Sequence, residues 1–345
     1  MHDEVTDQPV PKRGALAPAG WSAGSAGASL GHRIAGVREA GLLLIIVVVS
    51  VALTLLTPSF LTWGNLVTTL AGLSLDAIVV VGMTIALISG GFDLSVGAVF
   101  ACAGIVAVGL MIAEVPIPIA ILAALMSGAA WGSLNGFLIT RVGVNPFITT
   151  LGTMGMARGV ALVLTEGRVL APVPNGFKLL GQAQIGPANH GVPIIVFFGL
   201  ATILVGDVLL RNSVFLRQVY YVGGNERAAR LSGLPVDRIK FLVYLLSGLL
   251  AALAGVIAAA RFGSGSPLAG TGMELRLIAA AVIGGASLAG GEGTILGALL
   301  GLILLALVSD ALILLDVNVY WQQLVTGAIL VAAVTFDVLA RRRRG

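Results

Sequence analysis

Long apolar runs separated by short polar connections make up most of the 345-residue chain. Ten runs have the length of helices that cross a bilayer of about 30 Å. They cover approximately residues 41–56, 66–89, 96–113, 117–140, 144–164, 192–210, 238–260, 276–290, 293–313 and 318–339. The alternation in segments of about ten residues that marks β-barrel strands is not found. The pattern predicts an all-α polytopic membrane protein with about ten transmembrane helices. Because segments 74–76 and 284–293 interrupt their runs, nine or eleven are also compatible.

The composition agrees with this class. Hydrophobic residues make up 57% of the chain and charged residues 10%, whereas soluble domains carry about 25% charged residues. The 47 glycines suit helix interfaces at which backbones approach closely. The pattern predicts three regions: a disordered cytoplasmic tail at 1–40, a transmembrane domain at 41–340 and a basic cytoplasmic C-terminus at 341–345.

Basic residues gather in the connections on one side of the predicted bundle. If ten helices place both termini on one side, that side holds fifteen of the twenty Lys and Arg, against three on the other. Cytoplasmic connections carry an excess of Lys and Arg, so both termini and the region 211–240 are expected in the cytoplasm. The same rule explains the net charge of +4 without nucleic-acid binding.

A short charged stretch, 222–233, stands out near the middle of the chain. Asn225 is a good N-cap, Gly233 suits the left-handed position after a helix, and Pro235 prevents continuation. A seven-residue helix at 226–232 would rise only about 10 Å, too little to cross a membrane. Because five basic residues surround it, we expect this helix at the water side, facing a soluble partner.

The chain lacks the residue patterns of common catalytic and metal sites. None of its three lysines follows a glycine, so a phosphate-binding Gly-Lys-Ser/Thr loop is excluded. The three histidines lie far apart, which gives no metal cluster, and no nucleophile has a neighbouring base. The single Cys102 lies in an apolar run and suggests packing. We therefore expect no enzyme activity, cofactor or metal in this chain.

The segment Gly90-Gly-Phe-Asp-Leu-Ser-Val-Gly97 places a carboxylate between two apolar runs. A carboxylate in hydrocarbon costs about 2.5–3.5 kcal/mol on insertion scales, and no basic residue lies within thirty positions of Asp93. Asp93 or Ser95 could cap the next helix, with the two glycines allowing the turn. Alternatively, both side chains line a substrate path.

The fifth run offers further polar side chains. It opens at Asn145-Pro146, and Thr149 and Thr150 lie on neighbouring faces. These hydroxyls either line a polar path or bond to their own helix. Arg158, about two thirds of the way along, could lie in the path, form a buried pair or extend to the interface. The path candidates are Asp93, Ser95, Asn145, Thr149, Thr150 and Arg158.

Four segments in order form one set of motifs. They read Gly-Gly-Phe-Asp-Leu-Ser-Val-Gly at 90–97, Asn-Pro-Phe-Ile-Thr-Thr-Leu-Gly at 145–152, Gly-Gly-Asn-Glu-Arg-Ala-Ala-Arg-Leu-Ser-Gly at 223–233 and Ala-Ala-Ala-Val-Ile-Gly-Gly-Ala-Ser-Leu-Ala-Gly-Gly-Glu-Gly at 279–293. Over roughly 40–340 the chain resembles the permease subunit of bacterial ABC importers of the ribose and simple-sugar type. The last segment continues into glycines at spacings of four, which predicts helix packing. The stretches Gly-Gly-Phe-Asp-Leu and Gly-Gly-Ala-Ser-Leu, each after an apolar run, hint at an internal duplication.

The resemblance implies an inner-membrane permease that pairs with a second copy or a close paralogue. It also implies two cytoplasmic ATPase subunits, which bind ATP and Mg²⁺, an external sugar-binding protein and surrounding lipid. Phe92 departs mildly from the family, whose members often have an aliphatic residue there. The family's coupling segment, which receives the motion of the ATPase, falls on Gly224, Asn225, Glu226, Ala228, Ala229, Leu231, Ser232 and Gly233.

The implied mechanism is alternating access, in which closure of the ATPase dimer pushes on the 226–232 helix. Gly223-Gly224 and Gly233 are expected to act as flexible ends of this lever. Three alternatives stay open. The first is an ion-coupled secondary transporter, for which Asp76 and Asp93 are the plausible carboxylates. The others are a passive channel and an ABC permease for a non-sugar solute such as branched-chain amino acids.

Overall fold

The computed structural model describes residues 23–187 and 190–318, with scattered residues between 320 and 335. Helices dominate these residues, which confirms the all-α prediction. In chain order they are α1 (Ala23–Leu56), α2 (Trp63–Ile88), α3 (Val96–Ile112), α4 (Ile117–Phe137), the π-helical turn η1 (Leu138–Val142), α5 (Pro146–Thr165), α6 (Asn175–Gln182), α7 (Ile194–Asn212), α8 (Val214–Gly224), α9 (Glu226–Leu231), α10 (Val236–Phe262), α11 (Met273–Ile283) and α12 (Ile295–Leu314). Strands β1 (Gln184–Ile185) and β2 (Val192–Pro193) form a short antiparallel pair.

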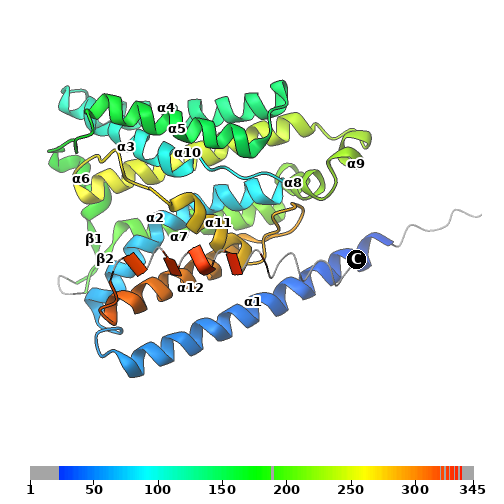
Figure 1. Cartoon of the computed structure of the whole chain (residues 1–345), viewed down its shortest axis with the longest axis horizontal. Helices are drawn as coiled ribbons and strands as arrows, with labels where there is room; N and C mark the ends of the chain where they lie inside the picture. The colour runs from blue at the N-terminus through cyan, green and yellow to red at the C-terminus, as the bar shows by residue number, and fades with distance from the viewer. Residues whose placement is uncertain are drawn as a thin grey trace, which may run out of the picture.

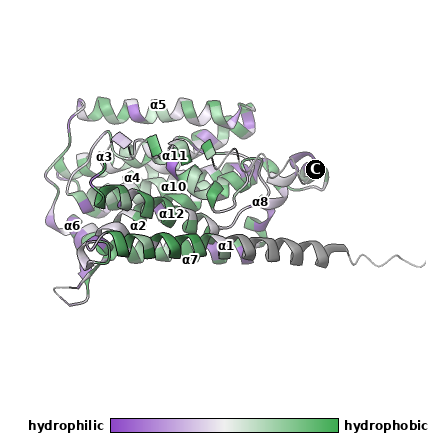
Figure 2. Cartoon of the chain, turned by 60° about the horizontal axis from the view of Figure 1, so that its bottom comes forward, coloured by the Kyte–Doolittle hydropathy of each residue, from purple (hydrophilic) through white to green (hydrophobic). Residues whose placement is uncertain are grey.

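The long helices run side by side, with α2, α3 and α10 at the centre (Figure 1). Helix α10 packs against α2, α3 and α4, and α2 also packs against α7, α11 and α12. Helix α7 is coloured as hydrophobic along most of its length (Figure 2), and large apolar side chains are exposed on several helices, among them Leu55 of α1, Val163 of α5 and Leu204 of α7. A bundle that exposes so much apolar surface is suited to lipid rather than water. The chain is a multi-pass membrane protein.

Seven helices in the described part of the chain are long and apolar enough to cross a membrane. The expected count of ten is not confirmed. Helix α3 has 17 residues, and half of the predicted last span, 318–339, lies outside the described residues. The predicted run at 276–290 overlaps only the 11-residue helix α11, which begins at Met273 and rises about 17 Å.

A non-helical segment before α11 supplies the missing length. It lies along α3, with Gly265 against Ile105 and Gly270 against Gly97. The segment therefore follows α3 from Ile105 to Gly97, a distance of eight helical residues or about 12 Å. Added to the rise of α11, this gives about 30 Å, the thickness of the bilayer core. Residues 263–283 therefore form one interrupted element long enough for a crossing. The sequence pattern ended one run at 260 and began the next at 276, so it treated the residues between them as a connection. The predicted interruption at 284–293 is confirmed, because α11 ends at Ile283 and α12 begins at Ile295.

The N-terminal boundary also differs from the prediction. Helix α1 begins at Ala23, so residues 23–40, predicted as part of a disordered tail, are helical. Residues 1–22 and the basic C-terminus at 341–345 lie outside the described residues. The two ends of the bundle differ in character: α6 and the β1–β2 pair lie at one end, and α8 and α9 at the other (Figure 1).

The predicted small-residue packing is confirmed between α11 and α12. A Cβ added at Gly297 would lie 2.1 Å from the carbonyl oxygen of Gly284. One added at Gly301 would lie 2.0 Å from the carbonyl oxygen of Ala280. Glycine at these positions lets the two backbones touch, which is how small-residue faces join membrane helices.

Candidate coupling site and buried polar core

Helix α9 is the short charged helix that the sequence predicts, shorter by one residue. The Oδ1 of Asn225 accepts a hydrogen bond from the Ala228 N–H at 2.9 Å, which caps the N-terminus. Gly233 has φ +81°, its N–H donates to the Arg230 carbonyl, and Leu234 N–H donates to the Ala229 carbonyl, each at 3.1 Å. These two bonds form a Schellman motif, so both predicted caps are present.

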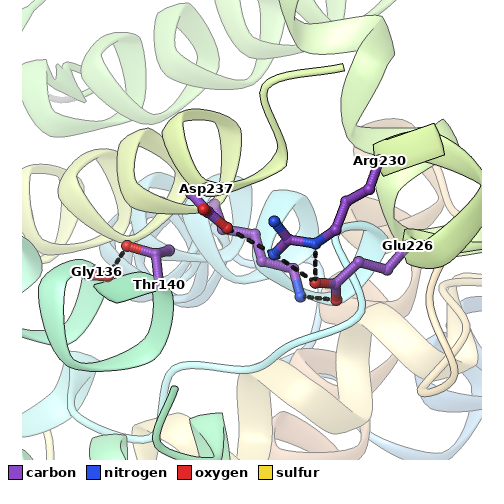
Figure 3. A network of polar contacts seen from close by, with 6 residues as sticks. Gly136, Thr140, Glu226, Arg230 and Asp237 are labelled. Carbon is purple, nitrogen blue, oxygen red and sulfur yellow. Dashed lines mark hydrogen bonds and ion pairs between the residues drawn. The ribbon is translucent and has the colours of Figure 1, made fainter. Parts of the chain in front are cut away.

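Four charged side chains join α9 to the first turns of α10 (Figure 3). Glu226 Oε1 pairs with Arg230 Nη2 at 2.9 Å, and Glu226 Oε2 pairs with Lys240. Arg230 Nη2 also pairs with Asp237 Oδ1 at 2.6 Å. We call Glu226, Arg230, Asp237 and Lys240 the ion-pair network. Because it bridges the turn between the helices, it fixes the orientation of α9 relative to α10.

The protonation states favour this network. Partial burial raises the pKa of Glu226, but the hydrogen bonds from Lys240 and Arg230 outweigh it and hold the pKa below its ordinary value. Bonds to Asp237 and Glu226 raise the pKa of Arg230. The stabilisation that the ion pairs of Glu226 give to the folded state is therefore complete at neutral pH. It is lost only as the pH falls through the lowered pKa of Glu226. Sequence reasoning missed the network, although the spacing of Glu226 and Arg230 by four residues was a usable signal.

The outer surface of α9 is open to a partner. Leu231 is 84% exposed, an unusual position for a large apolar side chain beside so many charges. Ala228 and Ser232 are exposed too, whereas Ala229 is buried at 4%. Of the residues predicted for coupling, Ala229 therefore packs inward and holds the helix in place, while Ala228, Leu231 and Ser232 form its accessible face.

Helix α8 meets two glycine-rich turns at its C-terminal end. Gly291 N–H donates to the Ile88 carbonyl at 2.9 Å. A Cβ added at Gly223 would lie 1.8 Å from that same oxygen, and one added at Gly290 would lie 2.7 Å from Gly90 Cα and from the Gly223 carbonyl oxygen. We call Gly90, Gly223, Gly290 and Gly291 the glycine junction. It joins the end of α8, the turn after α2 and the loop between α11 and α12.

The junction corrects the prediction that Gly223-Gly224 is a flexible end. Both residues belong to helix α8, and Gly223 is in backbone contact with two other segments. The Tyr220 hydroxyl donates to the Gly293 carbonyl at 2.9 Å, which adds a second tie between α8 and the 284–294 loop. The glycine at 223 permits close packing, and the sequence alone does not distinguish that use of glycine from flexibility.

Asp93 is at the centre of a buried polar network that joins α3, α4, α5 and α10. Its Oδ1 accepts from Ser95 N–H at 3.0 Å and from the Ser95 hydroxyl at 2.5 Å. Its Oδ2 accepts from the Ser247 hydroxyl at 2.8 Å. Asn135 Nδ2 donates to Ser95 Oγ at 2.9 Å, and Asn135 Oδ1 accepts from Thr153 at 2.7 Å. Sequence reasoning missed Asn135 and Ser247, whose partners are distant in the chain.

This network shows whether Asp93 caps a helix or lines a substrate path, the two alternatives that the sequence left open. The side chain is fully buried, and Ser95 is 1% exposed, so neither lines an open path in this conformation. The predicted capping is partly found: Asp93 accepts from the Ser95 amide just before α3, but its other bonds join neighbouring helices. A carboxylate supplied with several donors is tolerated in an apolar bundle without a cationic partner.

The remaining path candidates do not meet at one point. The Asn145 Oδ1 accepts from Phe147 N–H and caps α5, and Thr150 donates to the Pro146 carbonyl of its own helix. Arg158 Nη1 donates to the carbonyls of Pro267 and Ala269 at 2.5 and 2.8 Å, where it holds the non-helical segment before α11. These three side chains are engaged in local or structural bonds.

Thr149 differs from its neighbours. Its hydroxyl is buried and forms no hydrogen bond in the described structure. A buried hydroxyl without a partner is uncommon and marks a position where another polar group can be received. Among the predicted path residues it is the one whose buried side-chain oxygen has no hydrogen-bond partner in the described structure.

Asp76, one of the carboxylates considered for ion coupling, has a partner of its own. Its Oδ1 pairs with Arg276 Nη2 at 2.9 Å and joins α2 to α11. Asp93 bonds to a different set of residues, so the two carboxylates do not form one site. Among the described residues, no group of three His, Cys, Asp or Glu side chains could hold a metal ion.

Comparison with known proteins identifies the family. The chain matches, over residues 65–334, the family model described as "Branched-chain amino acid transport system / permease component". It therefore belongs to this family of permease components of ABC importers. No solved structure matches the chain.

The most informative relatives are two kinds of sugar importer. The chain is similar to the ribose import permease protein RbsC of Escherichia coli K12, with 41% identity over 304 residues, 87% of this chain and 93% of the relative. It is 38% identical over 297 residues to the L-arabinose transport system permease protein AraH of the same organism, covering 86% and 89%. It is also 38% identical over 299 residues to RbsC of Bacillus subtilis, covering 86% and 90%.

Proposed function

We propose that this permease forms the membrane path for a monosaccharide of the ribose or arabinose type. The support is that relatives named for ribose and L-arabinose import match almost nine tenths of the chain. An external binding protein delivers the sugar, and a second copy or a paralogue completes the path in the bacterial inner membrane. Separate cytoplasmic subunits bind ATP and Mg²⁺, in keeping with a sequence that has no phosphate-binding loop.

The observation that carries the coupling proposal is the exposed face of α9. A capped helix, fixed by ion pairs and presenting Leu231, is a rigid feature that a soluble subunit can grip. The excess of Lys and Arg around it favours the cytoplasmic side, with both termini on that side as well. We assign this face to the ATPase.

Movement of α9 reaches the centre of the bundle by two routes. The ion-pair network passes it to α10, and the glycine junction passes it through α8 to the end of α2 and the 284–294 loop. Helices α2 and α10 are both central. ATP binding by the partner then favours one of two arrangements of these helices, which is the requirement for alternating access.

The sugar path is proposed to run beside the Asp93 network. Asp93, Ser95 and their partners hold the surrounding helices together, and Asn145 and Arg158 fix the ends of neighbouring segments. The unpaired hydroxyl of Thr149 is the candidate for direct contact with a sugar hydroxyl when the path opens.

Substrate class and energy source are tested together in proteoliposomes that contain the permease, its ATPase and its binding protein. We expect uptake of labelled ribose or arabinose that requires ATP and persists with a protonophore. Uptake without ATP that collapses with the protonophore would identify a secondary transporter. Uptake of leucine instead of either pentose would reject the sugar assignment.

Charge reversal at Glu226 should uncouple the transporter. In Glu226→Lys, two ion pairs are replaced by repulsion from Arg230 and Lys240, so α9 loses its fixed orientation. Gly233→Pro should act similarly, because proline cannot adopt φ +81°. We expect sugar uptake to fall by about tenfold or more, a coupling loss of about 1.4 kcal/mol, while the permease stays inserted. Uptake and ATP hydrolysis are measured in the same proteoliposomes.

Glu114→Lys provides the matched control. Glu114 follows the C-terminal end of α3, is exposed and forms no ion pair in the described part of the chain, so the same reversal outside the coupling route should leave uptake near the wild-type rate. Wild-type uptake in both Glu226→Lys and Gly233→Pro would count against the α9 lever.

A further inference from the structure

A groove lies where η1 and the end of α4 meet the first turns of α10. It has a volume of about 330 Å³ and lies next to the ion-pair network, with Thr140 of η1 close to Asp237 in Figure 3. Its lining combines charged and apolar side chains: Phe137, Thr140, Arg141, Asp237, Arg238, Phe241 and Leu242. Apart from Asp237, no residue that lines the groove takes part in the proposed coupling mechanism.

The charge around the groove is positive and unbalanced. Asp237 is already paired with Arg230. Arg141 and Arg238 are exposed, and neither forms an ion pair with a carboxylate that the structure describes; Arg141 acts on Asp237 only through its charge, without a direct contact. Together, the groove and the ion-pair network hold four cations (Arg141, Arg230, Arg238 and Lys240) against two carboxylates (Glu226 and Asp237). This net charge of +2 is available to an anion.

The apolar part of the groove continues onto the sides of membrane-spanning helices. Phe137 is 51% exposed, Leu242 is 40% exposed, and Val142 beside them is 58% exposed. Apolar side chains directly next to unpaired arginines match the chemistry of a lipid, whose phosphate and acyl chains are joined at the membrane interface. A soluble subunit would meet the ends of these helices rather than their apolar sides.

We propose that this groove binds an anionic phospholipid of the cytoplasmic leaflet. The phosphate lies between Arg141 and Arg238, and an acyl chain follows Phe137, Phe241 and Leu242. Because Asp237 belongs both to the groove and to the ion-pair network, a bound lipid is held next to the tie between α9 and α10. The inference uses the proposed cytoplasmic location of α9 only to assign the groove to the cytoplasmic leaflet.

The test measures lipid binding to the purified full-length permease by native mass spectrometry. Phosphatidylglycerol is titrated against phosphatidylcholine with identical acyl chains. We expect the wild type to prefer phosphatidylglycerol, and Arg141→Gln and Arg238→Gln each to weaken its binding by about fivefold, the effect of about 1 kcal/mol per basic residue. Leu242→Gln should weaken both lipids. Arg217→Gln, which removes an exposed and unpaired arginine from α8, is the control and should retain wild-type binding.

Several results would overturn the proposal. The first is equal binding of phosphatidylglycerol and phosphatidylcholine by the wild type. The second is a loss of phosphatidylglycerol binding in Arg217→Gln as large as in the groove variants, since it would indicate a diffuse charge effect. If the double variant Arg141→Gln/Arg238→Gln binds lipid normally but no longer copurifies with the ATPase, the groove is a protein interface instead. Thermal unfolding checks that the variants are folded. Because no transport is measured, a failure of the sugar assignment would leave this result unaffected.

Discussion

Gly223→Ala is expected to lower ATP-driven uptake by about tenfold or more, whereas the same substitution at the adjacent Gly224 is expected to be tolerated. A Cβ added at Gly223 would lie 1.8 Å from the Ile88 carbonyl oxygen and 2.7 Å from the Gly291 nitrogen, and neither backbone atom can turn aside. Helix α8 must therefore move away from the glycine junction, at a cost of about 1–3 kcal/mol for overpacking. The route from α9 to α2 and the 284–294 loop is then broken.

The neighbouring glycine makes the experiment decisive. A Cβ at Gly224 would meet its closest atom at 3.9 Å, an ordinary contact, so Gly224→Ala adds the same methyl group to the same helix without displacing it. Initial uptake rates in proteoliposomes should fall by about tenfold or more for Gly223→Ala and stay near wild type for Gly224→Ala. Gel filtration with the ATPase establishes that both variants assemble. Equal uptake by the two assembled variants would show that the junction transmits nothing.

Asp93→Ala is expected to cause the largest loss of stability. The substitution removes the shared acceptor of Ser95 and Ser247 and leaves buried donors without partners. Each buried group left unpaired costs about 1–3 kcal/mol in soluble proteins, although hydrogen bonds measured in a membrane protein average about 0.6 kcal/mol. We expect a total near 2 kcal/mol and a clear fall in the thermal unfolding temperature of the purified permease.

Asp93→Asn separates hydrogen bonding from packing. Its side-chain oxygen can still accept from the Ser95 amide, and the Ser247 hydroxyl can rotate to accept from the new amide group. The loss should be less than half of that in Asp93→Ala. If both variants unfold at the wild-type temperature, the polar network does not hold α3, α4, α5 and α10 together.

Local features of the coupling site were predictable because they depend on neighbouring residues. The caps at Asn225 and Gly233 follow from side-chain chemistry within one helical turn, so the sequence is sufficient to place α9. The same holds for the glycine face between α11 and α12, where a spacing of four residues defines one side of a helix.

Features made by distant segments were not predictable in the same way. The bonds of Asp93 to Ser247 and of Asp76 to Arg276 join residues that no local pattern connects. The segment before α11 was predicted as a connection between two runs, because no local pattern shows that Gly265 and Gly270 pack against α3. The tight packing of Gly223 was mistaken for flexibility, since glycine serves both purposes.

The central claim is that α9 is held by an ATPase subunit on the cytoplasmic side, and a site-directed photocrosslink tests it most directly. Leu231→Cys, made in a Cys102→Ala background because Cys102 is buried and the chain has one cysteine, is labelled with a benzophenone maleimide in the assembled transporter. We predict an adduct that contains the ATPase subunit, and labelling only from the cytoplasmic side. Labelling from outside intact cells, or the absence of that adduct in a transporter that still takes up sugar, would contradict the account.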